Sequence, residues 1–246
     1  HLAWMCMGGE AKRDYPAPID AHSPWYQKYS LIEDHFARIN TVMRRGKAAV
    51  RVAVVHPIES YWMLLGPERQ TLGRRKAMDE RFSELTRWLL FNLIDFDFLS
   101  EGLLPDQKVR IEQGRLCVGE MTYEAVVVPK LLTMRRSTLD ILKAFQEQGG
   151  KVILLGQLPD YVDAKFSRDA KSLEERAVQI GFDKEELLSQ LQDYRDMDIC
   201  TQAGVRTDCL IYQLREEEAD KWLFVAHGKP EEKRRALTAE EQQWIW

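Results

Sequence analysis

Three residues that follow the apolar run 51–55 combine a carboxylate, an imidazole and an indole: Glu59, His56 and Trp62. Aromatic rings stack on the apolar faces of sugars, and polar side chains bond the hydroxyls. If the run is a strand, these residues lie at its carboxyl end, where ligands of open α/β sheets bind. We therefore expect a polar site here that is suited to a sugar. The alternative is an interdomain packing loop, which is the commoner setting for tryptophan.

A second group of charged and aromatic residues lies near the start of the chain, at Lys12, Arg13, Asp14 and Trp25. These side chains are also expected to contact a saccharide, and the alternative is a loop that joins two domains. Glycoside cleavage needs two facing carboxylates. Glu10 and Asp14 lie in a segment without periodicity, so their separation does not follow from the sequence. We assign no catalytic residue.

Several other kinds of chemistry are not supported by the residues at the expected turns. Pro57 and the bulky Tyr61–Trp62 pair follow the first apolar run, where a phosphate cradle would need glycines, so no cofactor is expected. An amidotransferase would carry a nucleophile after the run 151–155, but the chain there reads Gly-Gln-Leu-Pro. The four cysteines form no CxxC pair, so no metal site is expected.

Apolar patterning predicts strands that alternate with helices. The predicted strands are 51–55, 96–99, 124–128 and 151–155, with a hairpin at 109–118 before the third strand. The predicted helices are 30–45, 76–94, 137–148 and 167–195, with caps at Ser30, Ser137 and Asp183. This alternation predicts an α/β fold: a flavodoxin-like parallel sheet with helices on both faces. Two antiparallel strands are expected at 209–214 and 222–226.

Composition limits the classes of partner. A net charge of -4 gives no attraction for nucleic acid, and no apolar run reaches the length of a membrane helix. Scattered cysteines favour a cytoplasmic location. The chain opens at His1 and stops at Trp246 in an apolar end, so we expect a piece of a larger protein. The expected parts are an irregular segment 1–29, an α/β domain 30–200 and a β region 201–246.

Four segments resemble large bacterial glycoside hydrolases that are distantly related to β-galactosidases and α-L-rhamnosidases. They are Gly9–Pro16, Ser23–Tyr26, Ile32–Ile39 and Val54–Trp62. The resemblance implies that residues 1–29 end a catalytic (β/α)₈ barrel. It also implies a class I glutamine amidotransferase-like α/β domain without amidotransferase chemistry, and a β-sandwich that begins with the last hairpin. The family's catalytic carboxylates would precede His1, so none is assigned in this chain.

The leading interpretation is therefore a non-catalytic scaffold and oligomerisation portion of a carbohydrate-active hydrolase. Its partner would be a saccharide held by the preceding barrel, and the resemblance implies a homo-oligomer. The parent protein would be the enzyme, with this portion inactive alone. Two alternatives stay open: an autonomous amidotransferase-like enzyme with an unrecognised nucleophile, and a stand-alone binding or assembly module.

Overall fold

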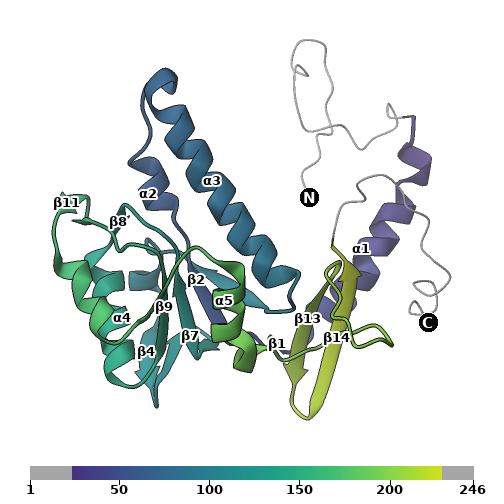
Figure 1. Ribbon diagram of the computed structural model, residues 1–246. Helices are drawn as coiled ribbons and strands as arrows, with labels where there is room; N and C mark the ends of the chain where they lie inside the picture. Colours follow the sequence, from purple (N-terminus) through teal and green to yellow (C-terminus); the bar gives the residue numbers. More distant parts are fainter. Residues whose placement is uncertain (1–23, 229–246) are drawn as a thin grey trace. The chain divides into compact units, whose positions relative to one another are not determined.

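The computed structural model describes residues 24–228 (Figure 1). These residues divide into two compact units. The first, which we call the helix–hairpin unit, contains residues 24–47 and Arg215–Phe224. The second, the α/β unit, contains Ala48–Leu214 and residues 225–228. None of the helices in residues 24–228 combines the length and the apolar composition that a bilayer-spanning helix needs.

A five-stranded parallel sheet forms the centre of the α/β unit. Its strands are β2 (Val52–Val55), β3 (Phe96–Leu99), β7 (Ala125–Val128), β9 (Lys151–Leu155) and β12 (Val178–Ile180). They lie in the order β12-β9-β7-β2-β3, which is the flavodoxin-like order. All four residues of both β2 and β7 are buried, as expected for central parallel strands covered on both faces. The predicted fold class is confirmed.

Helices cover both faces of this sheet (Figure 1). On one face, α3 (Glu68–Leu90) and α5 (Lys184–Leu191) bury Leu85, Leu89, Leu187 and Leu191 against β2 and β9. On the other face, α4 (Arg136–Glu147) buries Leu139, Leu142 and Phe145. The short helix α2 (Ile58–Trp62) follows β2 directly. Apolar residues at helical spacing thus place two core layers around one sheet.

The segment between β3 and β7 adds a small antiparallel sheet. The 3-10 helix η3 (Leu104–Asp106) precedes β4 (Val109–Glu112), β5 (Arg115–Val118) and β6 (Met121–Tyr123). The predicted hairpin is present, with Val109 opposite Val118, and β6 extends it to three strands. Leu116, Val118 and Tyr123 bury this sheet against the core on the α4 side.

The segment after β9 differs from the single helix predicted over 167–195. It forms the 3-10 helix η4 (Asp169–Glu175), then β12, α5 and the 3-10 helix η5 (Gln192–Tyr194). Val178 and Ile180 pair with β9 as an edge strand, because two β-branched residues in alternation fit a half-buried sheet edge. The predicted cap of α5 is confirmed: the Asp183 carboxylate accepts a hydrogen bond from the backbone N–H of Glu186 at 2.9 Å.

The other two predicted caps are wrong. Helix α1 (Ser30–Met43) has Tyr29 at its cap position and no side-chain capping bond. Helix α4 begins at Arg136, one residue before Ser137, and Arg135 occupies its cap position. The backbone N–H of Arg136 instead donates to the Asp163 carboxylate at 2.9 Å. Asp163, 27 positions away in the sequence, therefore caps α4 in place of the predicted Ser137.

The helix–hairpin unit holds the 3-10 helix η2 (Tyr26–Lys28), α1 and the tip of a hairpin. The hairpin strands are β13 (Leu210–Glu217) and β14 (Asp220–His227), which confirms the predicted antiparallel pair, and β1 (Lys47–Ala48) lies next to β13. Helix α1 contains no buried residue: Ile32 and Phe36 are exposed, and Ile39 and Met43, on the same face, are half-buried.

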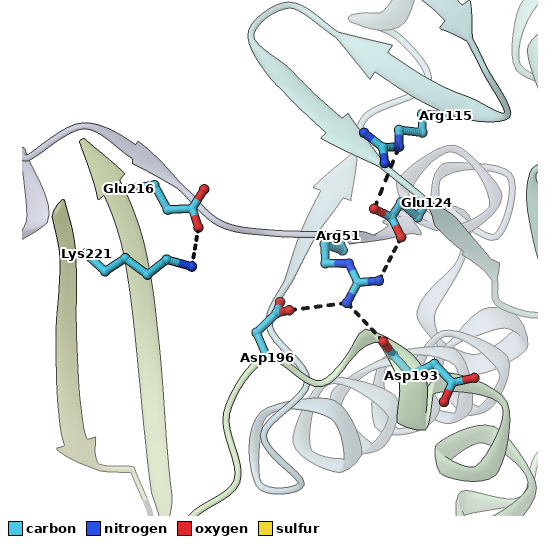
Figure 2. A network of polar contacts seen from close by, with 7 residues as sticks. All are labelled: Arg51, Arg115, Glu124, Asp193, Asp196, Glu216 and Lys221. Carbon is cyan, nitrogen blue, oxygen red and sulfur yellow. Dashed lines mark hydrogen bonds and ion pairs between the residues drawn. The ribbon is translucent and has the colours of Figure 1, made fainter. Parts of the chain in front are cut away.

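Contacts between distant parts of the sequence hold the hairpin tip in this unit. The Arg45 guanidinium stacks over the Trp222 ring at 5.0 Å, and the Arg215 guanidinium donates to the carbonyl oxygens of Arg45 and Gly46. Within the hairpin tip, Lys221 pairs with Glu216 at 2.8 Å (Figure 2).

A polar network lies at the amino edge of the parallel sheet (Figure 2). Arg51, immediately before β2, donates to the carboxylates of Glu124 at 2.8 Å and Asp196 at 3.2 Å, and to the carbonyl of Asp193 at 2.9 Å. Arg115 lies 3.8 Å from Glu124. The network joins the segments before β2 and β7 to residues 193–196, so its role is structural.

Candidate functional site

The carboxyl edge of the sheet brings two glutamates and an arginine together. Glu59 lies on α2 after β2, Glu101 follows β3, and Arg135 precedes α4. The Arg135 guanidinium donates to the Glu59 carboxylate at 2.5 Å, and its backbone N–H donates to the Glu101 carboxylate at 2.7 Å. One residue therefore links the loops that follow two neighbouring strands.

A hollow of about 420 Å³ opens beside this ion pair. Its lining residues are Glu59, Trp62, Met63, Thr133, Arg135, Asp163 and Ala164. We call it the Trp62 hollow, because the Trp62 side chain is 55% exposed at its margin. A ring, a carboxylate and a guanidinium on one surface can stack on an apolar ligand face while they bond hydroxyl groups.

Ser60 fixes the helix that carries Glu59 and Trp62. Its buried hydroxyl donates to the Thr133 carbonyl at 3.1 Å and accepts from the backbone N–H groups of Leu132 and Thr133 at 2.9 and 3.1 Å. Three hydrogen bonds to one buried hydroxyl satisfy the backbone where the chain leaves β7. The short helix α2 is therefore anchored, and the side chains it presents have a defined position.

Burial raises the pKa of Glu101 to about 7, and the nearby Glu59 carboxylate also raises it. The residue is only 1% exposed, so a ligand in the Trp62 hollow does not reach it. Its carboxyl group positions the Arg135 backbone instead.

A strained turn forms one side of the hollow. Asp163 and Ala164 connect β10 (Tyr161–Val162) to β11 (Lys165–Phe166), and their φ angles are 50° and 58°. The Ala164 N–H donates to the Thr133 hydroxyl at 3.1 Å, and Asp163 caps α4. Left-handed backbone at residues other than glycine is costly and is held here by these bonds.

Comparison with known proteins gives a likeness at the level of the fold. No protein-family model matches the chain, and no curated protein matches it. The fold is similar to that of a rhamnosidase from Novosphingobium sp. PP1Y, with a TM-score of 0.52 and 13% sequence identity. The match covers 86% of this chain and 20% of the rhamnosidase chain. At this identity the likeness concerns the fold, and the chain spans one fifth of that structure's length.

The residues predicted for the sugar site fall in different places. Glu59 and Trp62 share the hollow. His56 does not line it: its ring packs edge-on against Phe82 and Phe98, with centroids 5.0 and 5.5 Å away, and burial lowers its pKa.

The remaining predicted residues lie outside the α/β unit or outside the described residues 24–228. Trp25 belongs to the helix–hairpin unit, where it packs on Tyr29 at 5.7 Å. Lys12, Arg13 and Asp14 lie outside the described residues, so their predicted role stays a prediction.

Sequence reasoning missed Arg135, Asp163, Thr133 and Glu101. A signal existed for Glu101, because it follows the strand 96–99 and the carboxyl ends of parallel strands meet at one edge. No local signal existed for Asp163, which reaches the site because β10 pairs with β8 (Thr133–Met134) in parallel.

The geometry also bears on amidotransferase chemistry. Gly156, at the turn after β9, has a φ of 87° and carries no nucleophile. Among residues 24–228, no hydrogen bond joins a cysteine to a histidine, and no group of three or more His, Cys, Asp or Glu side chains could hold a metal ion. Cys117 is buried, while partial desolvation and the Asp198 carboxylate raise the pKa of Cys200. A raised pKa makes a thiol a poorer nucleophile.

Proposed function

We propose that this chain is a non-catalytic α/β portion of a carbohydrate-active glycoside hydrolase, and that the Trp62 hollow forms part of the rim of its saccharide site. The fold likeness to one fifth of a rhamnosidase supports this proposal. The hollow supplies the chemistry, since it offers a ring for stacking beside polar groups that match sugar hydroxyls.

The observation that carries the proposal is the exposed Trp62 ring beside a preformed ion pair. The Glu59 carboxylate accepts a hydrogen bond from Arg135, and Ser60 anchors α2, the helix that carries Glu59 and Trp62. Because the polar groups are already ordered, a saccharide would bind them without a large entropic cost of ordering side chains. An exposed tryptophan at a rigid position is also a typical anchor for a ligand.

The carboxylates at this edge favour binding over hydrolysis. Glycoside cleavage needs an acid and a base or nucleophile that face the same bond. Glu101 is buried away from the hollow, and the Glu59 carboxylate is bonded to Arg135. The proposal therefore places the catalytic carboxylates in another part of the parent hydrolase, and gives this portion a scaffold and oligomerisation role.

The test combines an activity assay and a binding assay on the 246-residue chain. We expect no turnover of 4-nitrophenyl α-L-rhamnopyranoside or β-D-galactopyranoside. We expect weak binding of L-rhamnose, D-galactose or their oligosaccharides in a calorimetric or NMR titration. Trp62→Ala should weaken that binding by about tenfold, which corresponds to about 1.4 kcal/mol. Phe36→Ala, which removes an exposed ring on α1, is the matched control and should leave it unchanged.

Three results would contradict the proposal. Hydrolysis by the chain alone would overturn the non-catalytic role. Saccharide affinity that is the same in Trp62→Ala and in the unsubstituted chain would overturn the role of the hollow. A light-scattering mass equal to one chain would overturn the oligomerisation role.

A further inference from the structure

The α/β unit has a second hollow, of about 300 Å³, at the carboxyl edge of the sheet. It lies between the segment after β2, the middle of α3, the loop after β7 and the residue before the α5 cap. The lining residues are Pro57, Leu64, Arg74, Ala77, Met78, Arg81, Phe82, Pro129, Lys130, Leu132 and Phe182. We call it the switch-point hollow.

This hollow lies at the topological switch point of the parallel sheet. Strands β2 and β7 are neighbours, but the chain leaves β2 toward β3 on one side and only then returns to β7 on the other. The crevice outside two such strands is left open, because their connections run in opposite directions. Pro57 and Pro129, which follow β2 and β7, both line the hollow. It therefore occupies the position where open α/β sheets most often bind ligands.

The uncharged part of the lining is entirely apolar. The rings of Phe82 and Phe182, the buried Leu64 and the thioether of Met78 give a surface that favours a hydrocarbon body. No hydroxyl, amide or carboxylate side chain is among the lining residues. This composition distinguishes the switch-point hollow from the polar Trp62 hollow, and it does not suit a sugar.

Every ionisable lining residue is a cation. Arg74 and Arg81 lie seven residues apart on α3, on one face of the helix, and Lys130 approaches from the loop after β7. Within residues 24–228 none of the three has an ion-pair partner, although Arg81 lies over the Phe182 ring at 5.5 Å. Three unpaired cations from two elements give the hollow a positive rim around an apolar floor.

We propose that the switch-point hollow binds a small organic anion that joins a carboxylate or phosphate group to an apolar body. The apolar body would pack between Phe82, Leu64 and Phe182, where each buried square ångström of hydrocarbon stabilises the complex. The anionic group would bond to the guanidinium and ammonium groups at the rim, which are the donors that recognise carboxylates and phosphates. The volume lies near the lower end of the range for ligand pockets, which selects a small ligand.

The probe is 4-phenylbutyrate, with 4-phenylbutyl phosphate as the phosphate counterpart. The 246-residue chain labelled with ¹³C at its methionine methyl groups is titrated, and the shift of the Met78 resonance is followed by NMR. Met134, which is fully buried on the opposite face of the sheet, serves as the internal reference. We expect saturable shifts at Met78 and none at Met134. The neutral 4-phenylbutanol and inorganic phosphate alone should each bind at least about tenfold more weakly.

Charge variants test the rim. Arg81→Gln and Lys130→Gln should each raise the Kd for 4-phenylbutyrate by about fivefold. Arg69→Gln removes a cation from the same helix that does not line the hollow, so its Kd should stay within about twofold. Ala77→Trp places a ring in the hollow and should abolish binding, and its melting temperature shows whether the chain is still folded.

The proposal is overturned if 4-phenylbutanol binds as tightly as 4-phenylbutyrate, because the cations would then contribute nothing. It is equally overturned if Met78 does not shift at roughly 10 mM probe, or if Ala77→Trp folds and still binds. Saccharide binding at the Trp62 hollow uses other residues, so failure here would leave that proposal standing.

Discussion

The buried carboxyl group of Glu101 accepts a hydrogen bond at 2.7 Å from the backbone N–H of Arg135, whose guanidinium donates to Glu59. Two acidic side chains from consecutive strand ends are therefore arranged around one arginine. Only Glu59 meets the charged end of that arginine. Glu101 meets the backbone in a site where burial opposes ionisation.

This arrangement makes stability depend on pH. Burial raises the pKa of Glu101 from 4.5 to about 7, so the folded state retains its proton where the unfolded state has lost it. The free energy of unfolding therefore falls as pH rises from about 4.5 to about 7, by about 3 kcal/mol from this residue.

Glu101→Gln should remove this pH dependence, because glutamine stays neutral and keeps an acceptor for the Arg135 N–H. Urea unfolding at pH 5 should give similar free energies for the variant and the unsubstituted chain, and at pH 8 the variant should be the more stable. Burial also raises the pKa of Asp95 to about 6, so Asp95 makes stability depend on pH in the same direction. This contribution is common to the variant and the unsubstituted chain. Equal stability at pH 8 would show that Glu101 ionises normally in the fold.

Trp62→Ala should have little effect on stability. The side chain is 55% exposed, so its loss leaves no sealed cavity, and we expect a change below about 1 kcal/mol. Leu89→Ala, on the buried face of α3, should cost about 2–5 kcal/mol. Denaturant unfolding of both variants checks this contrast. A loss for Trp62→Ala as large as that for Leu89→Ala would indicate a packing role and argue against a rim role.

Two glycine-to-alanine substitutions should act in opposite directions. A Cβ at Gly73, on the exposed part of α3, meets no atom within 4 Å, so Gly73→Ala should stabilise the helix by about 0.5–1 kcal/mol. A Cβ at Gly150 would lie 2.2 Å from the buried Phe145 ring, so Gly150→Ala should destabilise the protein by about 1–3 kcal/mol. Melting temperatures measured by calorimetry give the sign of each effect, and a shift in the same direction for both would contradict the expected packing.

Helix caps offer a third contrast. Asp183→Ala removes the hydrogen bond to the Glu186 N–H and should destabilise the chain by about 1 kcal/mol. Ser30→Ala removes no capping bond and should change stability by less than about 0.5 kcal/mol. Thermal unfolding monitored by circular dichroism distinguishes the two, and a larger loss for Ser30→Ala would reverse the assignment of caps.

The central strands could be predicted because their signal is local. The runs 52–55, 125–128 and 152–155 are apolar and rich in β-branched residues, and the turns around them contain glycine or proline. β12 was missed because Val178 and Ile180 alone carry its pattern, between segments rich in charged residues. The expected cap at Ser137 failed because its replacement, Asp163, becomes a neighbour only after β10 pairs with β8.

The candidate site shows the same division. Glu59 and Trp62 were placed correctly at a strand end, since they follow β2 directly in the sequence. Arg135 was missed because it lies seven positions after the end of β7, and its partner Glu59 lies 76 positions earlier. Which of the strand-end residues share a hollow depends on strand order and long-range pairing, which no window of sequence contains.

The contacts between Arg215 and the segment Arg45–Gly46 span 169 and 170 positions of the chain. During translation, at about 5–20 residues per second, the ribosome would add Arg215 roughly ten to thirty seconds after Arg45. During that interval, the segment at the end of α1 would lack its hydrogen bonds from Arg215. Nascent chains arrested before residue 215 would thus carry an unfinished helix–hairpin unit, a ready substrate for chaperones and proteases.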